Sequence, residues 1–481
     1  MLLTVKTTTL AAALILFSGS LRAADISDVI NRIAGSPGIK NASWGLSVKD
    51  ADSGKIVAER NPRLNLIPAS ILKVFVTAAA LDKLGPEKTI STRLYYDGAI
   101  SNGFLNGNIY IKGAGDASLG SQFIEGSVPM EEVFKAWTAA IKTAGIIVIN
   151  GSVVGDDSVF ESVQPGSWAW EDIGNYYAAQ PSALTLNDNL YKLYFKPSGA
   201  VGGEAAVLRT EPYVEGLRFE NYMKTGPEGS GDNGYIYAFP GRDLAALRGT
   251  IPQGAPEFAI KGALPDPALF AAQSFNSHLV KAGVNSNKKP YRGAPAAGAE
   301  LTLITETVSA PLKNVVRAAN KRSFNLYAEL LLRLLGGGRP EAGLAAVRSY
   351  VSESGTDVSE LDLADACGLS IRNKAKAETF TDALRGIYKK KYFQEFYDSL
   401  VYPGDPDAAG HLRNMGKGAP LEKNMRLKSG SLNGVRSYTG YLKTRKRKTL
   451  VFTSIINNYS APGASLDKIH EDLLLELYNN Y

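Results

Sequence analysis

A serine followed three residues later by a lysine can support catalysis when a helix places both side chains on one face. A lysine that loses its proton can act as general base for the serine hydroxyl, which then becomes a nucleophile. The chain carries this spacing three times, at Ser70/Lys73, Ser286/Lys289 and Ser465/Lys468. Only Ser70 begins a segment, 70–84, that is apolar on most sides, which predicts a buried helix with a polar N-terminal end. Such an end favours developing negative charge on the serine.

Two further short motifs add an amide and a second amine. Ser-x-Asn occurs at Ser274, Ser323 and Ser431, and Lys-Thr/Ser-Gly occurs at Lys224 and Lys428. The segment Ser323-Phe324-Asn325 opens an apolar helical stretch, and Lys428-Ser429-Gly430 opens a predicted strand, whereas Lys224 runs into a proline and a glycine-rich loop. Order and context together favour Ser70, Ser323 and Lys428 as one site. The alternative is three unrelated pieces of core and loop.

Composition narrows the class of protein. Hydrophobic residues make up 44% of the 481 residues and charged residues 21%, which fits a globular protein and excludes a disordered one. The net charge of +6 is small for this length and does not indicate nucleic-acid binding. The single cysteine, Cys367, excludes an intramolecular disulfide and a cysteine-based zinc site, and the three histidines are scattered. We therefore expect no metal and no other cofactor.

The N-terminus has the pattern of a secretory signal. Lys6 precedes an apolar run at 10–17, and the small residues Ala23 and Ala24 follow. We expect residues 1–24 to be a signal peptide and the mature protein to be periplasmic or otherwise extracytoplasmic, the alternative being a membrane-anchored start. No later stretch approaches about 18 consecutive apolar residues, so we expect no transmembrane anchor in the mature chain.

The order of predicted elements indicates an α/β (α+β) protein. A helix at 26–33 and two strands at 44–49 and 55–60 come before the Ser70 segment, and helices at 312–335 and 341–354 follow much later. Three strands and a helix, at 427–431, 438–443, 449–457 and 465–478, close the chain. Between these parts, short strands separated by turns dominate. The sequence therefore predicts a catalytic domain made of 25–91 plus 290–481 around a β-rich insert at 92–289; two tandem domains are the alternative.

Taken together, these motifs resemble those of the low-molecular-mass class C penicillin-binding proteins, the D-alanyl-D-alanine carboxypeptidase/endopeptidase family. Pro68 to Lys73 resembles the first family motif, and the 323 − 70 = 253 residues to the second resemble its long insertion. The segments 110–119 and 166–172 resemble signatures within that insertion. The resemblance implies a penicillin-recognising transpeptidase-like domain with β-rich domains, two of them nested, inserted between the first and second catalytic motifs.

The resemblance also implies a mechanism and a substrate. Ser70 would attack the peptide bond between the last two residues of a peptidoglycan stem peptide ending in D-Ala-D-Ala, and a β-lactam would trap the same serine. Lys73, its pKa lowered by burial and by Lys428, would be the base, and Ser323 would pass the proton to the leaving amine. Asn325 would position Lys73 and the substrate amide. Lys428 would bind the terminal carboxylate together with Ser429, in the segment Ser429-Gly430-Ser431. The backbone N–H groups of Ser70 and Ser431 would form the oxyanion hole.

Two residues of the insert would bind the substrate's side chain. In the family, an acid at the position of Asp172 and an aromatic residue at that of Tyr177 help to bind the amino end of diaminopimelate; an ordinary loop carboxylate and a packed ring are the alternatives. The sequence departs from the family at Ile371, where some members place a carboxylate-binding arginine, and Arg372 comes one residue late. Cys367, in the same segment, is expected to pack rather than react.

Two other functions stay open on the sequence alone. A β-lactamase or esterase built on the same domain would hydrolyse its acyl-enzyme quickly, whereas a peptidase would hold penicillin as a persistent label. A non-catalytic wall-binding module would bind peptidoglycan without needing Ser70.

Overall fold

The computed structural model describes residues 26–408 and 410–481. The predicted signal peptide, residues 1–24, lies outside the described residues. Among the described helices, none combines the length and the apolar character needed to span a bilayer.

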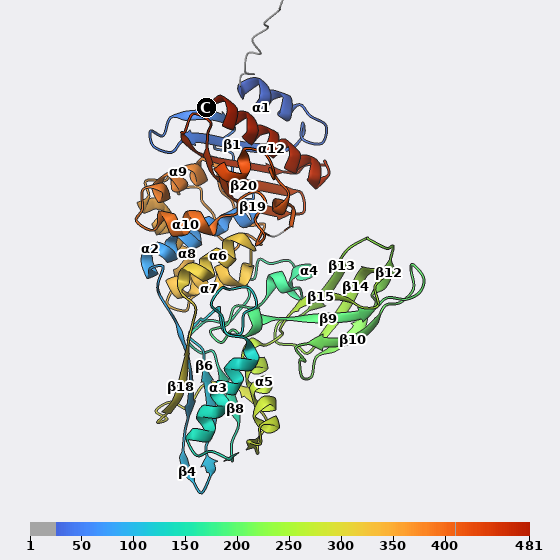
Figure 1. Cartoon of the computed structure of the whole chain (residues 1–481), viewed down its shortest axis with the longest axis vertical. Helices are drawn as coiled ribbons and strands as arrows, with labels where there is room; N and C mark the ends of the chain where they lie inside the picture. Colours follow the sequence, from blue (N-terminus) through green and yellow to red (C-terminus); the bar gives the residue numbers. More distant parts are fainter. Residues whose placement is uncertain (1–25, 409) are drawn as a thin grey trace, which may run out of the picture.

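The upper part of the molecule is built on one antiparallel sheet of five strands (Figure 1). Its order is β19 (Met425–Leu432), β20 (Val435–Lys443), β21 (Thr449–Asn457), β1 (Ser43–Asp50) and β2 (Ile56–Arg60). The first and last parts of the chain thus meet at the β21–β1 pair, where Ser43 lies opposite Asn457. Helices α1 (Ile26–Ala34) and α12 (Gly463–Asn480) cover one face with their apolar sides.

A helical layer covers the other face of this sheet. It contains α2 (Lys73–Leu84), α6 (Leu312–Lys321), α7 (Asn325–Leu335), α8 (Pro340–Glu353), α9 (Ala377–Tyr388) and α10 (Phe393–Ser399). Helix α2 is apolar around its circumference because it runs between α6, α7 and α8, and only its N-terminal end faces a polar site. A stacked ring pair, Phe75 on Phe380 with centroids 4.5 Å apart, joins it to α9.

The insert begins and ends in a second sheet, below the helical layer (Figure 1). This sheet has the order β17 (Tyr291–Arg292), β8 (Val153–Asp156), β6 (Ile109–Lys112), β3 (Ser91–Tyr96) and β18 (Thr302–Val308). A smaller sheet joins β16 (Asn285–Ser286), β7 (Val148–Ile149), β5 (Phe104–Asn106) and β4 (Ala99–Ser101). Helices α3 (Met130–Thr143) and α5 (Pro267–Lys281) contribute Trp137 and Phe275 to the core of this part.

A further β-rich unit, the outer lobe (190–263), is nested inside the insert. It contains a three-stranded sheet of β10 (Ala206–Glu211), β9 (Leu190–Lys196) and β15 (Phe258–Ala263). Its other sheet is made of β11 (Arg218–Asn221), β14 (Leu244–Pro252), β12 (Lys224–Gly226) and β13 (Asn233–Ala238). The short helices α4 (Trp170–Ile173), η2 (Tyr176–Ala178) and η3 (Asn187–Asn189) precede this lobe, and Figure 1 shows it projecting sideways from the molecule.

The strand pairing bears on where the insert ends. β18 is hydrogen-bonded to β3 over its whole length, and β17 pairs with β8. The strands 291–292 and 302–308, which the sequence analysis assigned to the catalytic part, are thus hydrogen-bonded to the insert. A strand this long at 302–308 was missed because its polar threonines give no clear alternation. We propose that the catalytic domain comprises residues up to 90 and from 309 onward.

Two predicted helices differ in detail from those observed. The segment 70–84 divides into a 3-10 turn, η1 (Ala69–Leu72), and α2, so that Ser70 lies in the turn and Lys73 begins the helix. The stretch 312–335 is broken at Ser323, where the backbone enters the left-handed region with φ 58°. No glycine or proline marks this break, which is why periodicity alone predicted a continuous helix.

The central sheet allows a matched test of how burial stabilises this fold. We expect Ile455→Ala, in fully buried β21, to lower the free energy of unfolding by about 2–5 kcal/mol, because it removes core contacts on the helical side. The control Ile56→Ala changes the same side chain in the edge strand β2, where it is 53% exposed, and is expected to cost less than about 1 kcal/mol. Chemical denaturation measures both, and equal losses would contradict the assignment of the core.

Candidate active site

Ser70 is held at the edge of the five-stranded sheet by contacts to the residues just before it. The side chain of Asn457, at the end of β21, accepts from the N–H of Ile67 at 2.8 Å and donates to its carbonyl at 3.1 Å. The Ser437 hydroxyl on β20 donates to the carbonyl of Pro68 at 2.6 Å. Ala69 then adopts a left-handed φ of 51°, an uncommon conformation for a residue with a side chain. The fold therefore fixes the turn that presents Ser70.

Lys73 lies one helical turn below Ser70, as the spacing predicted. Its ammonium Nζ is 2.8 Å from the Ser70 Oγ, 2.6 Å from the Asn325 Oδ1 and 2.6 Å from the backbone oxygen of Cys367. The side chain is fully buried, and this burial lowers the pKa of Lys73 to about 8. The negative charges of Asp365 and Glu329 act in the opposite direction and limit the lowering. A neutral amine can thus exist at Ser70 near neutral pH.

The loop 365–370 supplies the carbonyl that faces Lys73. Asp365 holds this loop by accepting from the N–H groups of Gly368 and Ser370, both at 2.7 Å, and from the indole of Trp168 at 2.9 Å. Gly368 has φ 82°, and a Cβ there would lie 2.0 Å from the oxygen of Ala69, so only glycine fits beside the Ser70 turn.

Glu329 and Arg333, one turn apart on α7, form a buried ion pair beneath this loop, with 3.4 Å between nitrogen and oxygen. Glu329 also accepts from the N–H groups of Ala366 and Cys367 at 2.8 and 3.1 Å. The sequence analysis did not predict this ion pair. The signal for it was the presence of two opposite charges four residues apart in the apolar run 326–335.

Ser323 and Asn325 come from the junction of α6 and α7. The left-handed φ of Ser323 turns its hydroxyl toward β19, where it accepts from Lys428 Nζ at 2.8 Å. The Asn325 amide contacts both sides of the site: its oxygen accepts from Lys73, and its nitrogen donates to the carbonyl of Tyr177 at 2.7 Å. The three motifs predicted to form one site are therefore brought together.

Lys428 lies on the edge strand β19, directly beside the Ser70 turn. It is buried, and its Nζ also donates to the carbonyl of Ser429 at 2.7 Å. Burial, with the charge on Lys73 as a second cause, holds the pKa of Lys428 well below its usual value. The sequence analysis expected the charge of Lys428 to lower the pKa of Lys73. Instead, the charge of Lys73 lowers the pKa of Lys428, and the pKa of Lys73 is lowered by burial. A Cβ at Gly430 would lie 2.8 Å from the Ser70 nitrogen, so the absent side chain lets strand and turn approach.

The two predicted substrate-binding residues of the insert lie next to this site. Asp172 is on α4 and Tyr177 is on η2. Partial burial raises the pKa of Asp172, although the neighbouring Tyr177 hydroxyl opposes this shift. Because the carbonyl of Tyr177 also accepts from Asn325, the pair is tied directly to the second motif.

The loop residues that depart from the family pattern, Ile371 and Arg372, are both exposed, Ile371 by 66%. The Cys367 thiol is buried, and burial raises its pKa well above the usual value, which fits a packing role. The oxygens of Glu329 and Asp365 and the Cys367 sulfur lie within 4.8 Å of one another, as metal ligands could. The carboxylates of that cluster, however, are already bonded to Arg333 and to backbone N–H groups.

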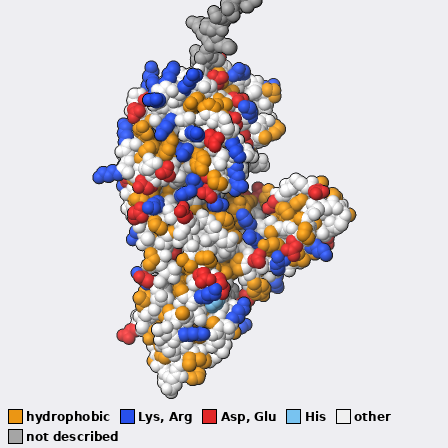
Figure 2. Space-filling view, viewed as in Figure 1, with side chains coloured by type: hydrophobic (Ala, Val, Ile, Leu, Met, Phe, Trp, Pro, Cys, Tyr) orange, Lys and Arg blue, Asp and Glu red, His pale blue; other side chains and the backbone are white. Residues whose placement is uncertain are grey.

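The surface is hollowed near the outer lobe (Figure 2) and beside the Ser323 turn. Figure 2 shows a notch between the upper part of the molecule and the outer lobe, and Lys and Arg side chains gather along the upper edge that faces it. Figure 1 places α4, which carries Asp172, at the inner end of this notch. A cavity of about 320 Å³ lies beside the turn that carries Ser323, lined among others by Phe123, Lys321 and Arg322.

Comparison with known proteins gives consistent matches along the chain. It is 28% identical over 460 residues to a D-alanyl-D-alanine carboxypeptidase of an Actinomadura species, covering 92% of this chain and 82% of the relative. It is 25% identical over 480 residues to the D-alanyl-D-alanine carboxypeptidase DacB of Haemophilus influenzae, covering 94% of each. The crystal structure of penicillin binding protein 4 from H. influenzae superposes with a TM-score of 0.79 at 24% identity, covering 95% of this chain and 99% of that one.

This structural likeness confirms the predicted fold class, a transpeptidase-like domain with β-rich insertions. The model of the D-Ala-D-Ala carboxypeptidase 3 (S13) family matches residues 26–475, nearly the whole described chain. The protein therefore belongs to the D-Ala-D-Ala carboxypeptidase 3 family.

Proposed function

We propose that this protein is a serine-type D-alanyl-D-alanine carboxypeptidase and endopeptidase that acts on peptidoglycan stem peptides through an acyl-enzyme on Ser70. The observation that carries the proposal is the buried Lys73 amine, which contacts both the Ser70 hydroxyl and the Asn325 amide. Family membership supports the reaction class.

In the acylation step, neutral Lys73 takes the proton of the Ser70 hydroxyl while Oγ bonds to the carbonyl carbon of the penultimate D-alanine. The negative charge that develops on the carbonyl oxygen is stabilised by the backbone N–H groups of Ser70 and Ser431, each worth about 3 kcal/mol in comparable sites. The C–N bond then breaks, and the Ser323 hydroxyl relays to the leaving amine the proton that Lys73 took up. The products are an ester on Ser70 and free D-alanine.

Lys428 and Ser429 hold the terminal carboxylate of the substrate in this scheme. A carboxylate beside the buried ammonium favours the charged form of Lys428 and offsets the lowering of its pKa by burial. Water next hydrolyses the ester. A stem peptide with a free end makes the enzyme a carboxypeptidase, and a cross-linked stem makes it an endopeptidase. A β-lactam acylates Ser70 in the same way, and its leaving group stays attached.

The substrate also sets where the protein works. Peptidoglycan lies outside the cytoplasmic membrane, and the apolar run at 10–17 followed by Ala23 and Ala24 has the pattern of an export signal. We therefore place the mature protein in the periplasm or an equivalent extracytoplasmic space.

Labelling with penicillin tests the nucleophile. We expect intact-protein mass spectrometry to show one persistent penicillin adduct, which peptide mapping assigns to Ser70, and Ser70→Ala to remove both the adduct and D-alanine release. The control Ser431→Ala keeps the backbone N–H and should still be labelled. An undiminished adduct in Ser70→Ala rejects the mechanism, and rapid hydrolysis of the adduct favours a β-lactamase instead.

The pH dependence tests the base. Because the pKa of Lys73 is lowered to about 8, its neutral fraction rises with pH and is half at that point. We expect the acylation rate to rise about tenfold per pH unit well below pH 8 and to level off above it. Lys73→Arg is the matched control, since guanidinium stays charged and should give negligible acylation at every pH. A flat wild-type profile between pH 6 and 9 would contradict the assignment.

Paired substrates test the role of Asp172. Wild-type enzyme should prefer a stem peptide whose third side chain ends in a free amine over the same peptide acetylated there. Asp172→Asn should reduce this preference by roughly 10- to 100-fold in kcat/KM, the scale of a hydrogen bond to a charged group. Glu171→Gln, one residue away on α4, is the control. An unchanged preference in Asp172→Asn refutes the proposed contact.

A further inference from the structure

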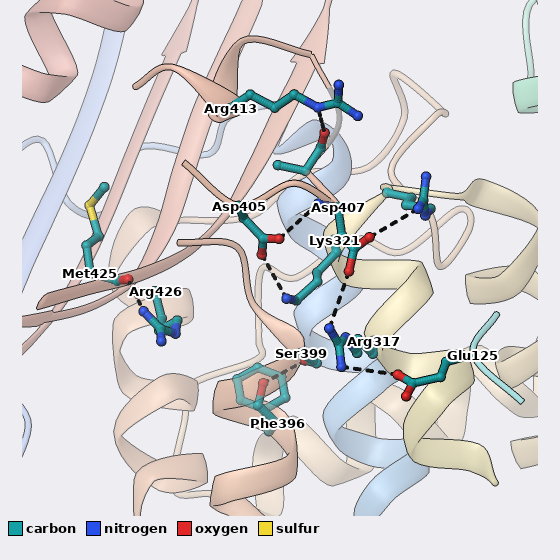
Figure 3. Close-up of polar contacts among 12 residues, drawn as sticks. Glu125, Arg317, Lys321, Phe396, Ser399, Asp405, Asp407, Arg413, Met425 and Arg426 are labelled. Carbon is teal, nitrogen blue, oxygen red and sulfur yellow. Dashed lines mark hydrogen bonds and ion pairs between the residues drawn. The ribbon is translucent and has the colours of Figure 1, made fainter. Parts of the chain in front are cut away.

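Ser323 and Lys428 meet across the cleft from different elements, and one segment of chain contacts both of those elements. We call residues 401–407 the brace. At its start, Val401 pairs with Leu427, the neighbour of Lys428 on β19, through hydrogen bonds of 2.9 and 2.8 Å in both directions. At its end, the brace reaches the last turn of α6, immediately before Ser323 (Figure 3).

The most buried contact at that end is an ion pair. Asp405 Oδ2 lies 2.8 Å from Lys321 Nζ, with only 1% and 6% of their side chains exposed. The other oxygen of Asp405 accepts from the N–H of Asp407 at 3.0 Å, which fixes the carboxylate within its own loop. Removing one partner of such a pair leaves an uncompensated charge in the interior, so both side chains are held in place. Figure 3 shows Lys321 directed at this carboxylate.

The residues on either side of Lys321 are fixed as well. Asn320 donates to the hydroxyl of Ser399, just before the brace, at 2.8 Å. Arg322 forms an ion pair with Asp407 at 3.2 Å, and its guanidinium lies 5.3 Å from the ring centre of Phe123 in the insert. Three consecutive residues before Ser323 are therefore bound to the brace or its flank.

Outer contacts add to these. Arg317 forms ion pairs with both Asp407 and Glu125 at 3.3 Å (Figure 3). The charged groups of Lys321 and Arg426 lie 5.2 and 4.8 Å from the ring centre of Tyr402. These pairs are more exposed than the buried one and contribute less. Asp405 is thus the residue on which the brace depends at its α6 end.

We propose that Asp405 is a positioning residue for the reaction, acting through Lys321 to keep the Ser323 hydroxyl on Lys428. Ser323 needs such support because its left-handed φ of 58° is unfavourable for a residue with a side chain and persists only when its surroundings impose it. The proposal rests on the function proposed above, in which Ser323 passes a proton to the leaving amine.

This role predicts a dependence on the leaving group. An amine cannot leave without receiving a proton, whereas a thiolate leaves readily without one. A misplaced Ser323 should therefore slow cleavage of a D-Ala-D-Ala amide far more than cleavage of a matching thioester. A loss of folded enzyme would lower both rates by the same factor.

The experiment compares kcat/KM for the two substrates in wild type and in Asp405→Asn. We expect the amide rate to fall on the order of 10- to 100-fold, because small misplacements of a catalytic group cost this much, and the thioester rate to fall less than about threefold. The control is Asp382→Asn, which removes an ion pair with Lys49 of 2.6 Å elsewhere in the same domain. It should leave the ratio of the two rates unchanged.

A second pair of variants covers the case in which Asp405→Asn does not fold. Lys321→Arg keeps the charge and should keep the wild-type ratio of the amide rate to the thioester rate. Lys321→Met should lower this ratio, as Asp405→Asn does. Equal losses on both substrates, or an unchanged amide rate, would overturn the positioning role. The proposed function fails separately, if wild-type enzyme cleaves neither substrate or if Ser70→Ala cleaves both.

Discussion

The structure depends on burying two lysine amines at one site, with no carboxylate of the described residues hydrogen-bonded to either. Water solvates an ammonium strongly, so burial favours the neutral amine unless polar groups replace the water. Here the replacements are neutral oxygens: the Asn325 amide and the Cys367 carbonyl at Lys73, and the Ser323 hydroxyl and the Ser429 carbonyl at Lys428. The carboxylates of Asp365 and Glu329 are not bonded to Lys73, and their charges limit the lowering of its pKa. A base that is half neutral near pH 8 follows from this arrangement.

Such placement requires a backbone that departs from regular structure at both serine motifs. Ala69 and Ser323 adopt left-handed φ values next to or at the catalytic hydroxyls, each at a cost on the order of 1–3 kcal/mol. The surroundings impose these conformations. The side chains of Ser437 and Asn457 fix the chain before Ala69, and the residues of α6 before Ser323 are bound to the brace.

The sequence predicted the motifs and their association but not the details that position them. Ser70, Lys73, Ser323 and Lys428 could be found because each motif is short and local, and because chain order and sequence context together excluded the other copies. The break at Ser323 could not be found, since the left-handed turn there is imposed by tertiary contacts rather than by local propensity. The same holds for β18, whose place in the insert depends on pairing with β3, some 200 residues earlier.

The insert is not part of the catalytic domain, yet it contacts the helix of the second motif directly. Its Tyr177 carbonyl accepts from Asn325, its Asp188 carboxylate accepts from the hydroxyl of Tyr327 at 2.6 Å, and the Glu161 and Val163 carbonyls accept from the guanidinium of Arg333. All three partners lie on α7. Because α7 also carries Glu329 under the loop that faces Lys73, a shift of the insert would be transmitted to the base as well as to the substrate pocket. The position of the insertion, between the first and second motifs, is consistent with this role. The inserted chain leaves the catalytic domain after Ser70 and contacts α7, the helix whose Asn325 accepts from Lys73.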